Sequence, residues 1–247
     1  MSTIVKSVKS HGGTVTFYKH ESDILKCTME YAVYTPPPTA PPSEPTSSTL
    51  QGASSSSVRL GLVYLSGLTC TAENVATKGE ATAAAAGEGV FLLMPDTSSR
   101  HQDLPSTDET GWDLGRGAGY YLDATKEPWQ QCAMESYILA LVTEVGEALN
   151  INAWSITGHS MGGLGALHLG LRHDRFVSVS AFAPISHPSV CPWGIKAFTA
   201  YLGDDETAWA KYDPTKLVQA GCGAHIRGAI LVDQGSADNF LSAGQLR

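Results

Sequence analysis

The sequence predicts an α/β fold with a mostly parallel, doubly wound sheet, because apolar segments of strand length alternate with helical segments over most of its length. Two alternating segments near the N-terminus predict antiparallel strands at one edge of that sheet. The chain has 247 residues, of which 43% are hydrophobic, and this is enough to bury one large core. We therefore expect residues 1–247 to form a single domain.

The two N-terminal segments, 14–18 and 27–34, alternate polar and apolar residues as half-buried strands do. The segment that follows, 36–57, contains six Pro, seven Ser and three Thr, and its one charged residue is Glu44. Such a composition cannot bury enough apolar surface to become ordered. We expect a disordered surface loop within the domain rather than a linker between domains.

Strands and helices are expected to alternate after this loop. The expected strands are short apolar runs at 59–65, 89–95, 154–157, 177–182 and 228–233. The expected helices are segments rich in Ala, Leu or Glu at 72–87, 131–149 and 164–171. The last two strands are continuously apolar, as are strands that are buried on both faces. In such a sheet the active site lies at the carboxyl ends of the strands.

Composition and charge exclude several classes of partner. The 16 Lys and Arg residues face 24 Asp and Glu residues, for a net charge of −8, and no basic cluster indicates a nucleic acid or an anionic membrane. The N-terminus lacks the apolar stretch of a signal peptide, and no run approaches the roughly 18 apolar residues that cross a bilayer. The five cysteines are odd in number and widely spaced, which favours reduced thiols over disulfides or a metal site. We expect a soluble cytoplasmic protein whose cysteines hold no metal.

The motif Gly158-His159-Ser160-Met161-Gly162 lies between an expected strand and an expected helix. A sharp turn at this point presents a serine hydroxyl for nucleophilic attack, and it needs glycine two positions before and two after the serine because strand and helix approach closely there. The sequence therefore predicts that Ser160 is a nucleophile. The alternative is a glycine-rich turn that carries an idle serine. We expect His159 to pack near the site rather than to act as the base, because its side chain leaves the turn in another direction.

A serine nucleophile needs a carboxylate, a histidine and two oxyanion donors. Asp233 and Asp238 both follow the last expected strand, and we favour Asp238 because it lies in the loop beyond the strand; for either, the alternative is a carboxylate that caps a turn. The expected oxyanion donors are the N–H groups of Met161, next to the serine, and of Leu68, in the loop after an early strand. Cys70 ends that loop, as either a sensitive thiol or an inert packing residue.

Eight short motifs in order resemble the S-formylglutathione hydrolase family, also called esterase D, which has the α/β-hydrolase fold. The motifs are Ser66-Gly-Leu-Thr-Cys-Thr71, Trp112-Asp-Leu-Gly-Arg-Gly-Ala-Gly-Tyr120, Asp123-Ala-Thr125, Gly158-His-Ser-Met-Gly-Gly163, Ser180-Ala-Phe-Ala-Pro184, Cys191-Pro-Trp-Gly194, Tyr201-Leu-Gly203 and Asp233-Gln-Gly235. The similarity runs from about residue 12 to 245, interrupted mainly by the Pro/Ser-rich loop.

The resemblance implies a cytosolic serine esterase that converts the thioester S-formylglutathione to formate and glutathione in formaldehyde catabolism. It implies Ser160 as nucleophile, Asp238 as acid, Leu68 and Met161 as oxyanion donors, and Cys70 near the site. It implies no cofactor, a small-molecule substrate and a possible homodimer. Because a formyl group is small, we expect a tight acyl pocket, with Trp193 in its wall.

The sequence departs from the family pattern at its end. The family's catalytic histidine would follow Asp238 by a few tens of residues, and all eight histidines precede Asp238. We therefore expect a shortened product or an incomplete gene model of an active enzyme, one that lacks the last helix and strand. Two other functions stay open: a general short-chain carboxylesterase or acyltransferase, and a catalytically dead hydrolase-fold module that binds a partner.

Overall fold

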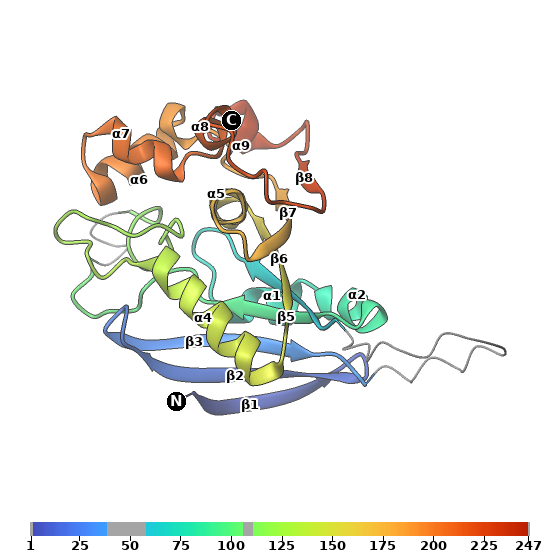
Figure 1. Ribbon diagram of the computed structural model, residues 1–247. Coiled ribbons are helices and arrows are strands. Elements are labelled where there is room, and N and C mark those ends of the chain that lie inside the picture. The colour runs from blue at the N-terminus through green and yellow to red at the C-terminus, as the bar shows by residue number, and fades with distance from the viewer. Residues whose placement is uncertain (1, 39–57, 106–110, 247) are drawn as a thin grey trace.

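The computed structural model describes residues 2–38, 58–105 and 111–246 (Figure 1). Most of the expected Pro/Ser-rich loop at 36–57 lies outside these residues. The described strands form one eight-stranded sheet in the order β1-β2-β3-β5-β4-β6-β7-β8. Their bounds are β1 (Thr3–Ser10), β2 (Gly13–Ser22), β3 (Cys27–Thr35), β4 (Leu60–Leu65), β5 (Phe91–Pro95), β6 (Ala153–His159), β7 (Phe176–Phe182) and β8 (Ile230–Asp233).

The direction of the strands follows the prediction. Each pair among β1-β2, β2-β3 and β3-β5 is antiparallel, and each pair from β5-β4 to β7-β8 is parallel. The described helices are α1 (Ala72–Lys78), α2 (Ala81–Glu88), α4 (Met134–Leu149), α5 (Met161–Arg172), α6 (Pro192–Leu202), α7 (Glu206–Trp209), α8 (Pro214–Gln219) and α9 (Asn239–Ser242). The predicted α/β class, with antiparallel strands at its N-terminal end, is confirmed.

Alternation along β5 shows how the sheet separates two layers of the core. Phe91 and Leu93 join the larger hydrophobic cluster, to which α4 and α5 contribute, whereas Leu92 and Met94 join a second cluster with residues of α1 and α2. Successive strand residues point to opposite faces of a sheet, so β5 is covered by helices on both sides. Its complete burial follows from this position.

The helix expected over 72–87 is two helices, so that prediction is wrong. Gly79 ends α1, and its N–H donates to the Val75 carbonyl at 3.0 Å. Glu80 then adopts φ 47° before α2 begins, and a non-glycine residue in this left-handed region interrupts a helix. Strand β1 was not predicted, because this exposed edge strand mixes lysines and serines with its apolar residues.

The predicted burial of the last two strands on both faces is also wrong. Strand β7 buries Phe176 but exposes 38% of Phe182, and β8 is exposed along its whole length. The reason is the place of β8 at the end of the strand order, where it pairs only with β7. Ile230 and Val232 line an open apolar cavity of about 300 Å³ beside α8 instead of packing closely against it.

Candidate active site

Ser160 lies in the sharp turn between β6 and α5, as predicted. Its backbone has φ 58° and ψ −120°, a conformation that costs an L-residue on the order of 1 to 3 kcal/mol. The Ser160 N–H donates to the Phe182 carbonyl of β7 at 2.9 Å, which ties the turn to the neighbouring strand. The surrounding structure therefore holds this serine in a strained conformation at the carboxyl end of the sheet.

The two glycines of the motif are required by the closeness of strand and helix. A Cβ placed on Gly158 would lie 2.1 Å from the Gly162 carbonyl oxygen, and one placed on Gly162 would lie 2.0 Å from the Leu65 carbonyl oxygen. Both distances are far shorter than any van der Waals contact, and both neighbours are backbone atoms that cannot turn aside. The spacing of the motif is therefore a steric requirement of the turn.

The loop 66–70, which follows β4, lies against this turn. A Cβ placed on Gly67 would lie 3.3 Å from the Ser160 Cβ. Within the described residues, neither the Leu68 nor the Met161 amide donates a hydrogen bond, whereas the Thr69 amide donates to the Gly117 carbonyl at 2.8 Å. Met161 is the first residue of α5, where N–H groups have no partner within the helix. Both amides therefore lack a partner among the residues that the structure describes, and their role as oxyanion donors stays a prediction.

Cys70 and His159 both line a cavity of about 230 Å³ beside α1, together with Lys78. Burial raises the pKa of the Cys70 thiol, and the Gly67 backbone and Lys78 only partly offset that effect. The thiol is therefore protonated near neutral pH and is a poor nucleophile there. His159 is exposed, and its expected place near the site without a role as the base stays a prediction.

The register of three strands brings the predicted acid to the same edge of the sheet as the serine. His159 pairs with Phe182, and Phe182 pairs with Asp233. Ser160 and Asp238 each follow the end of one of these strands, so both lie beyond the carboxyl edge. This common edge is where catalytic groups of a parallel sheet collect.

Both candidate aspartates are placed by local contacts. Asp238 caps α9: its Oδ1 accepts from the Phe240 N–H at 2.8 Å, and its Oδ2 accepts from the Gln234 side chain at 3.2 Å. Asp233 ends β8 with an exposed side chain, and its carbonyl accepts from the Ala183 N–H at 2.7 Å. The capping role considered from the sequence is therefore present at Asp238, beside its proposed catalytic role.

Trp193, at the start of α6, packs in an aromatic group close to Asp238. Its ring lies 4.8 Å from that of Phe240 and 5.3 Å from that of Trp112, and the Trp193 backbone N–H donates to the Gln245 side-chain oxygen at 2.8 Å. The side chain is 9% exposed. Trp193 therefore supports the segment that carries Asp238, and its place in the acyl pocket stays a prediction.

Within the described residues, no histidine hydrogen-bonds to Ser160 or to the Asp238 carboxylate. His20 bonds to Tyr137, His173 to Glu135 and His225 to the Gly170 carbonyl. His168 is fully buried, and burial lowers its pKa to about 3. Of the remaining histidines, His11 contacts Ser10 and Thr82, His101 accepts from the Asp103 N–H, and His187 lies 3.7 Å from the Asp213 carboxylate. His159 is the exposed residue next to Ser160.

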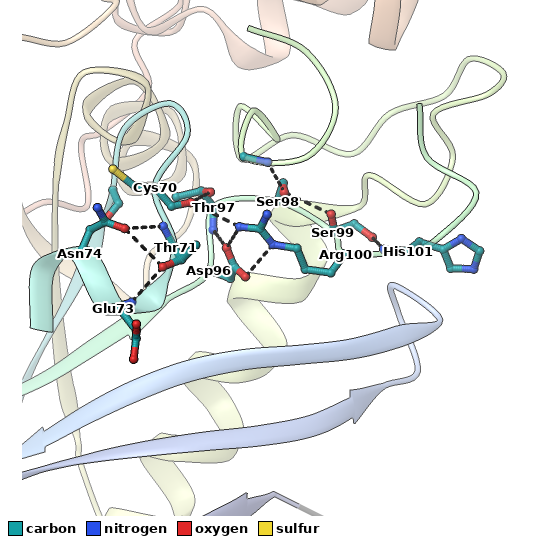
Figure 2. Close-up of polar contacts among 12 residues, drawn as sticks. Cys70, Thr71, Glu73, Asn74, Asp96, Thr97, Ser98, Ser99, Arg100 and His101 are labelled. Carbon is teal, nitrogen blue, oxygen red and sulfur yellow. Dashed lines mark hydrogen bonds and ion pairs between the residues drawn. The ribbon is translucent and has the colours of Figure 1, made fainter. Parts of the chain in front are cut away.

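Sequence reasoning missed the residues that hold the loop 66–70. Three side chains donate hydrogen bonds to carbonyls at the ends of this loop. Tyr121 donates to Ser66, and Thr97 and Arg100 donate to Cys70, as Figure 2 shows. Nothing in the sequence around these residues signals the contact, because their partners lie 27 to 55 positions away. In the part of the chain that the structure describes, no three His, Cys, Asp or Glu side chains are grouped to hold a metal ion, and no helix is long and apolar enough to cross a membrane.

Comparison with known proteins agrees with this geometry. The Esterase family model matches residues 22–247. The mouse S-formylglutathione hydrolase is 42% identical over 98% of this chain and 81% of its own length, and that of Arabidopsis thaliana is 42% identical over 96% and 79%. The solved structure of S-formylglutathione hydrolase from Agrobacterium tumefaciens superposes with a TM-score of 0.84 at 39% identity, over 99% of this chain and 83% of that one. The chain therefore belongs to the esterase family of the S-formylglutathione hydrolases.

Proposed function

We propose that this chain is a thioester hydrolase that converts S-formylglutathione to formate and glutathione, with Ser160 as its nucleophile. The observation that carries the proposal is the strained turn at Ser160, flanked by the unoccupied Leu68 and Met161 amides. The relatives with about 42% identity are named for this reaction.

The chemistry follows from the geometry of the turn. The Ser160 hydroxyl oxygen attacks the formyl carbonyl carbon, and the carbonyl oxygen becomes an oxyanion that the Leu68 and Met161 amides stabilise. The carbon–sulfur bond then breaks, and the glutathione thiolate leaves and takes up a proton. Water attacks the formyl-enzyme ester, which releases formate and restores the serine hydroxyl.

The serine proton must pass to a base during the first step, and Asp238 is the proposed carboxylate that orients this base. No described histidine contacts either group, and no described residue is assigned the role of base. A thioester suits the site because a thiolate is a better leaving group than an alkoxide. We place Trp193 in the wall of a tight acyl pocket, since it lies beside the helix that Asp238 caps.

The proposal extends to the setting of the reaction. Formaldehyde catabolism is the route in which the family substrate arises, and the cytosol is the proposed compartment. The five cysteines, all free thiols, support a reducing compartment. A homodimer is proposed from the family resemblance alone, and sedimentation equilibrium tests it.

The test compares hydrolysis of S-formylglutathione with that of p-nitrophenyl acetate by the purified chain and by Ser160→Ala. We expect a higher kcat/KM for the thioester, loss of hydrolysis in the variant, and fluorophosphonate labelling of Ser160 in the parent only. A preference for the aryl ester would indicate a general carboxylesterase. Absence of labelling together with absence of hydrolysis would indicate a module without catalysis and would overturn the proposal.

A further inference from the structure

The two ends of the loop 66–70 are each held by a hydroxyl group from a fully buried side chain. The Tyr121 hydroxyl donates to the Ser66 carbonyl at 2.8 Å, and the Thr97 hydroxyl donates to the Cys70 carbonyl at 2.5 Å. Both donors have no exposed surface. Leu68 lies between these two fixed carbonyls, so the direction of its amide depends on both.

Tyr121 also contacts the helix that begins after the serine. A Cβ placed on Gly165 of α5 would lie 2.5 Å from the Tyr121 ring, so the ring occupies the space that the glycine leaves. Burial raises the pKa of Tyr121 well above its ordinary value, and its hydroxyl therefore stays a donor throughout the working pH range. One side chain thus fixes the distance between the loop and the helix that contains Met161.

Thr97 is fixed in turn by its own backbone. Its N–H donates to the Asp96 carboxylate at 2.7 Å, and its carbonyl accepts from the Gly119 N–H at 3.2 Å. Asp96 forms an ion pair with Arg100, and Arg100 donates to the same Cys70 carbonyl at 3.3 Å (Figure 2). The Thr97 hydroxyl therefore has little freedom to follow a moving loop.

We propose that Tyr121 and Thr97 are positioning residues that aim the Leu68 amide at the oxyanion. This inference rests on the proposed function, because it assigns a catalytic purpose to the loop. Neither hydroxyl touches the substrate; each acts through the carbonyl that it holds. Misplacing a catalytic group by about 1 Å costs up to about 100-fold in rate, and loss of an interaction that is made only in the transition state lowers kcat without raising KM. The expected signature is a fall in kcat with little change in KM.

The variants Tyr121→Phe and Thr97→Val remove only the hydroxyl groups, and Thr97→Ser restores one of them. We expect kcat for S-formylglutathione to fall by about 10- to 100-fold in the first two variants, with KM within about twofold, and to recover in Thr97→Ser. Hydrogen exchange measured by mass spectrometry is expected to rise at residues 66–71. Tyr137→Phe and Thr82→Val are matched controls at buried positions.

The controls remove hydroxyls that bond elsewhere. The Tyr137 hydroxyl contacts His20, and that of Thr82 contacts Ser10 and His11. Both controls are expected to match the parent in kcat and in exchange at residues 66–71. Thermal unfolding of every variant shows whether the comparison is made between folded proteins.

Three results would overturn the inference. The first is unchanged exchange at 66–71 in Tyr121→Phe and Thr97→Val, and the second is faster exchange with unchanged kcat. The third is an equal loss of kcat in Thr97→Ser or in the controls. If the parent hydrolyses neither the thioester nor the aryl ester, the proposed function itself fails, and exchange alone then shows whether the hydroxyls order the loop.

Discussion

A salt bridge of 2.7 Å joins Glu135, in the first turn of α4, to Arg172, in the last turn of α5. Each charge lies at the helix end that its sign favours. His173 donates to the same carboxylate at 2.8 Å. Burial alone would raise the pKa of Glu135, but the bonds from His173 and Arg172 outweigh it and lower that pKa well below its ordinary value.

We predict that Glu135→Gln lowers the free energy of unfolding by about 3 kcal/mol at pH 7, as breaking a buried ion pair does. The folded-state pKa is depressed, so this stabilisation is complete above the unfolded-state pKa of about 4.3 and is lost as the pH falls below it. Urea unfolding at pH 7 and pH 3.5 measures the difference. Glu147→Gln, at an exposed position on α4, is the control, and an equal effect at both pH values would contradict the prediction.

A second pH dependence comes from His168, which packs against Tyr212 with ring centroids 5.4 Å apart. Burial lowers its pKa from 6.5 to about 3. Between these two values His168 is protonated in the unfolded chain and neutral in the folded chain. The parent should lose up to about 1.4 kcal/mol per pH unit from this site between pH 6.5 and 3. His168→Leu should show a shallower decline, and identical slopes for the two proteins would disprove this.

A matched pair of glycine-to-alanine substitutions tests the steric restriction at Gly162. Gly162→Ala places that carbon 2.0 Å from a backbone oxygen, and we expect it to cost about 1 to 3 kcal/mol of stability and to abolish labelling of Ser160. Gly87→Ala, on α2, meets nothing within 4 Å and should stabilise the protein by up to about 1 kcal/mol. Chemical unfolding and fluorophosphonate labelling of both variants provide the test.

Relief of strain at the serine should be measurable. Ser160→Gly removes the side chain from a backbone with φ 58°, and we expect it to raise the free energy of unfolding by about 1 kcal/mol while it eliminates labelling. Ser160→Ala keeps a Cβ and should eliminate labelling without this gain. Equal stability of the two variants would show that the turn stores no strain.

Substitution of the two aspartates separates capping from catalysis. Asn caps a helix about as well as Asp does, so Asp238→Asn should change stability by less than about 0.5 kcal/mol. If Asp238 orients the base, hydrolysis of S-formylglutathione should fall by about 10³-fold or more. Asp233→Asn should leave hydrolysis unchanged. Loss of hydrolysis in Asp233→Asn but not in Asp238→Asn would show that Asp233 is the carboxylate that orients the base.

The features that the sequence could predict are those that depend on neighbouring residues. The spacing of Gly158, Ser160 and Gly162 follows from one turn, and apolar runs such as 89–95 follow from local patterning. The exposure of β8 could not be predicted, because it depends on which strands and helices lie beside it. The bonds of Tyr121 and Thr97 to the loop 66–70 were missed for the same reason: they join segments that only the folded chain brings together.

Strand β8 also has a practical consequence for work with the purified protein. Its outer edge pairs with no described strand, and Ile230, Leu231 and Val232 are each about half exposed. Unpaired main-chain groups beside apolar side chains are a template for pairing between molecules. Concentrated samples are therefore expected to self-associate through this edge, and lysine in place of Leu231 is a direct means of keeping them monodisperse.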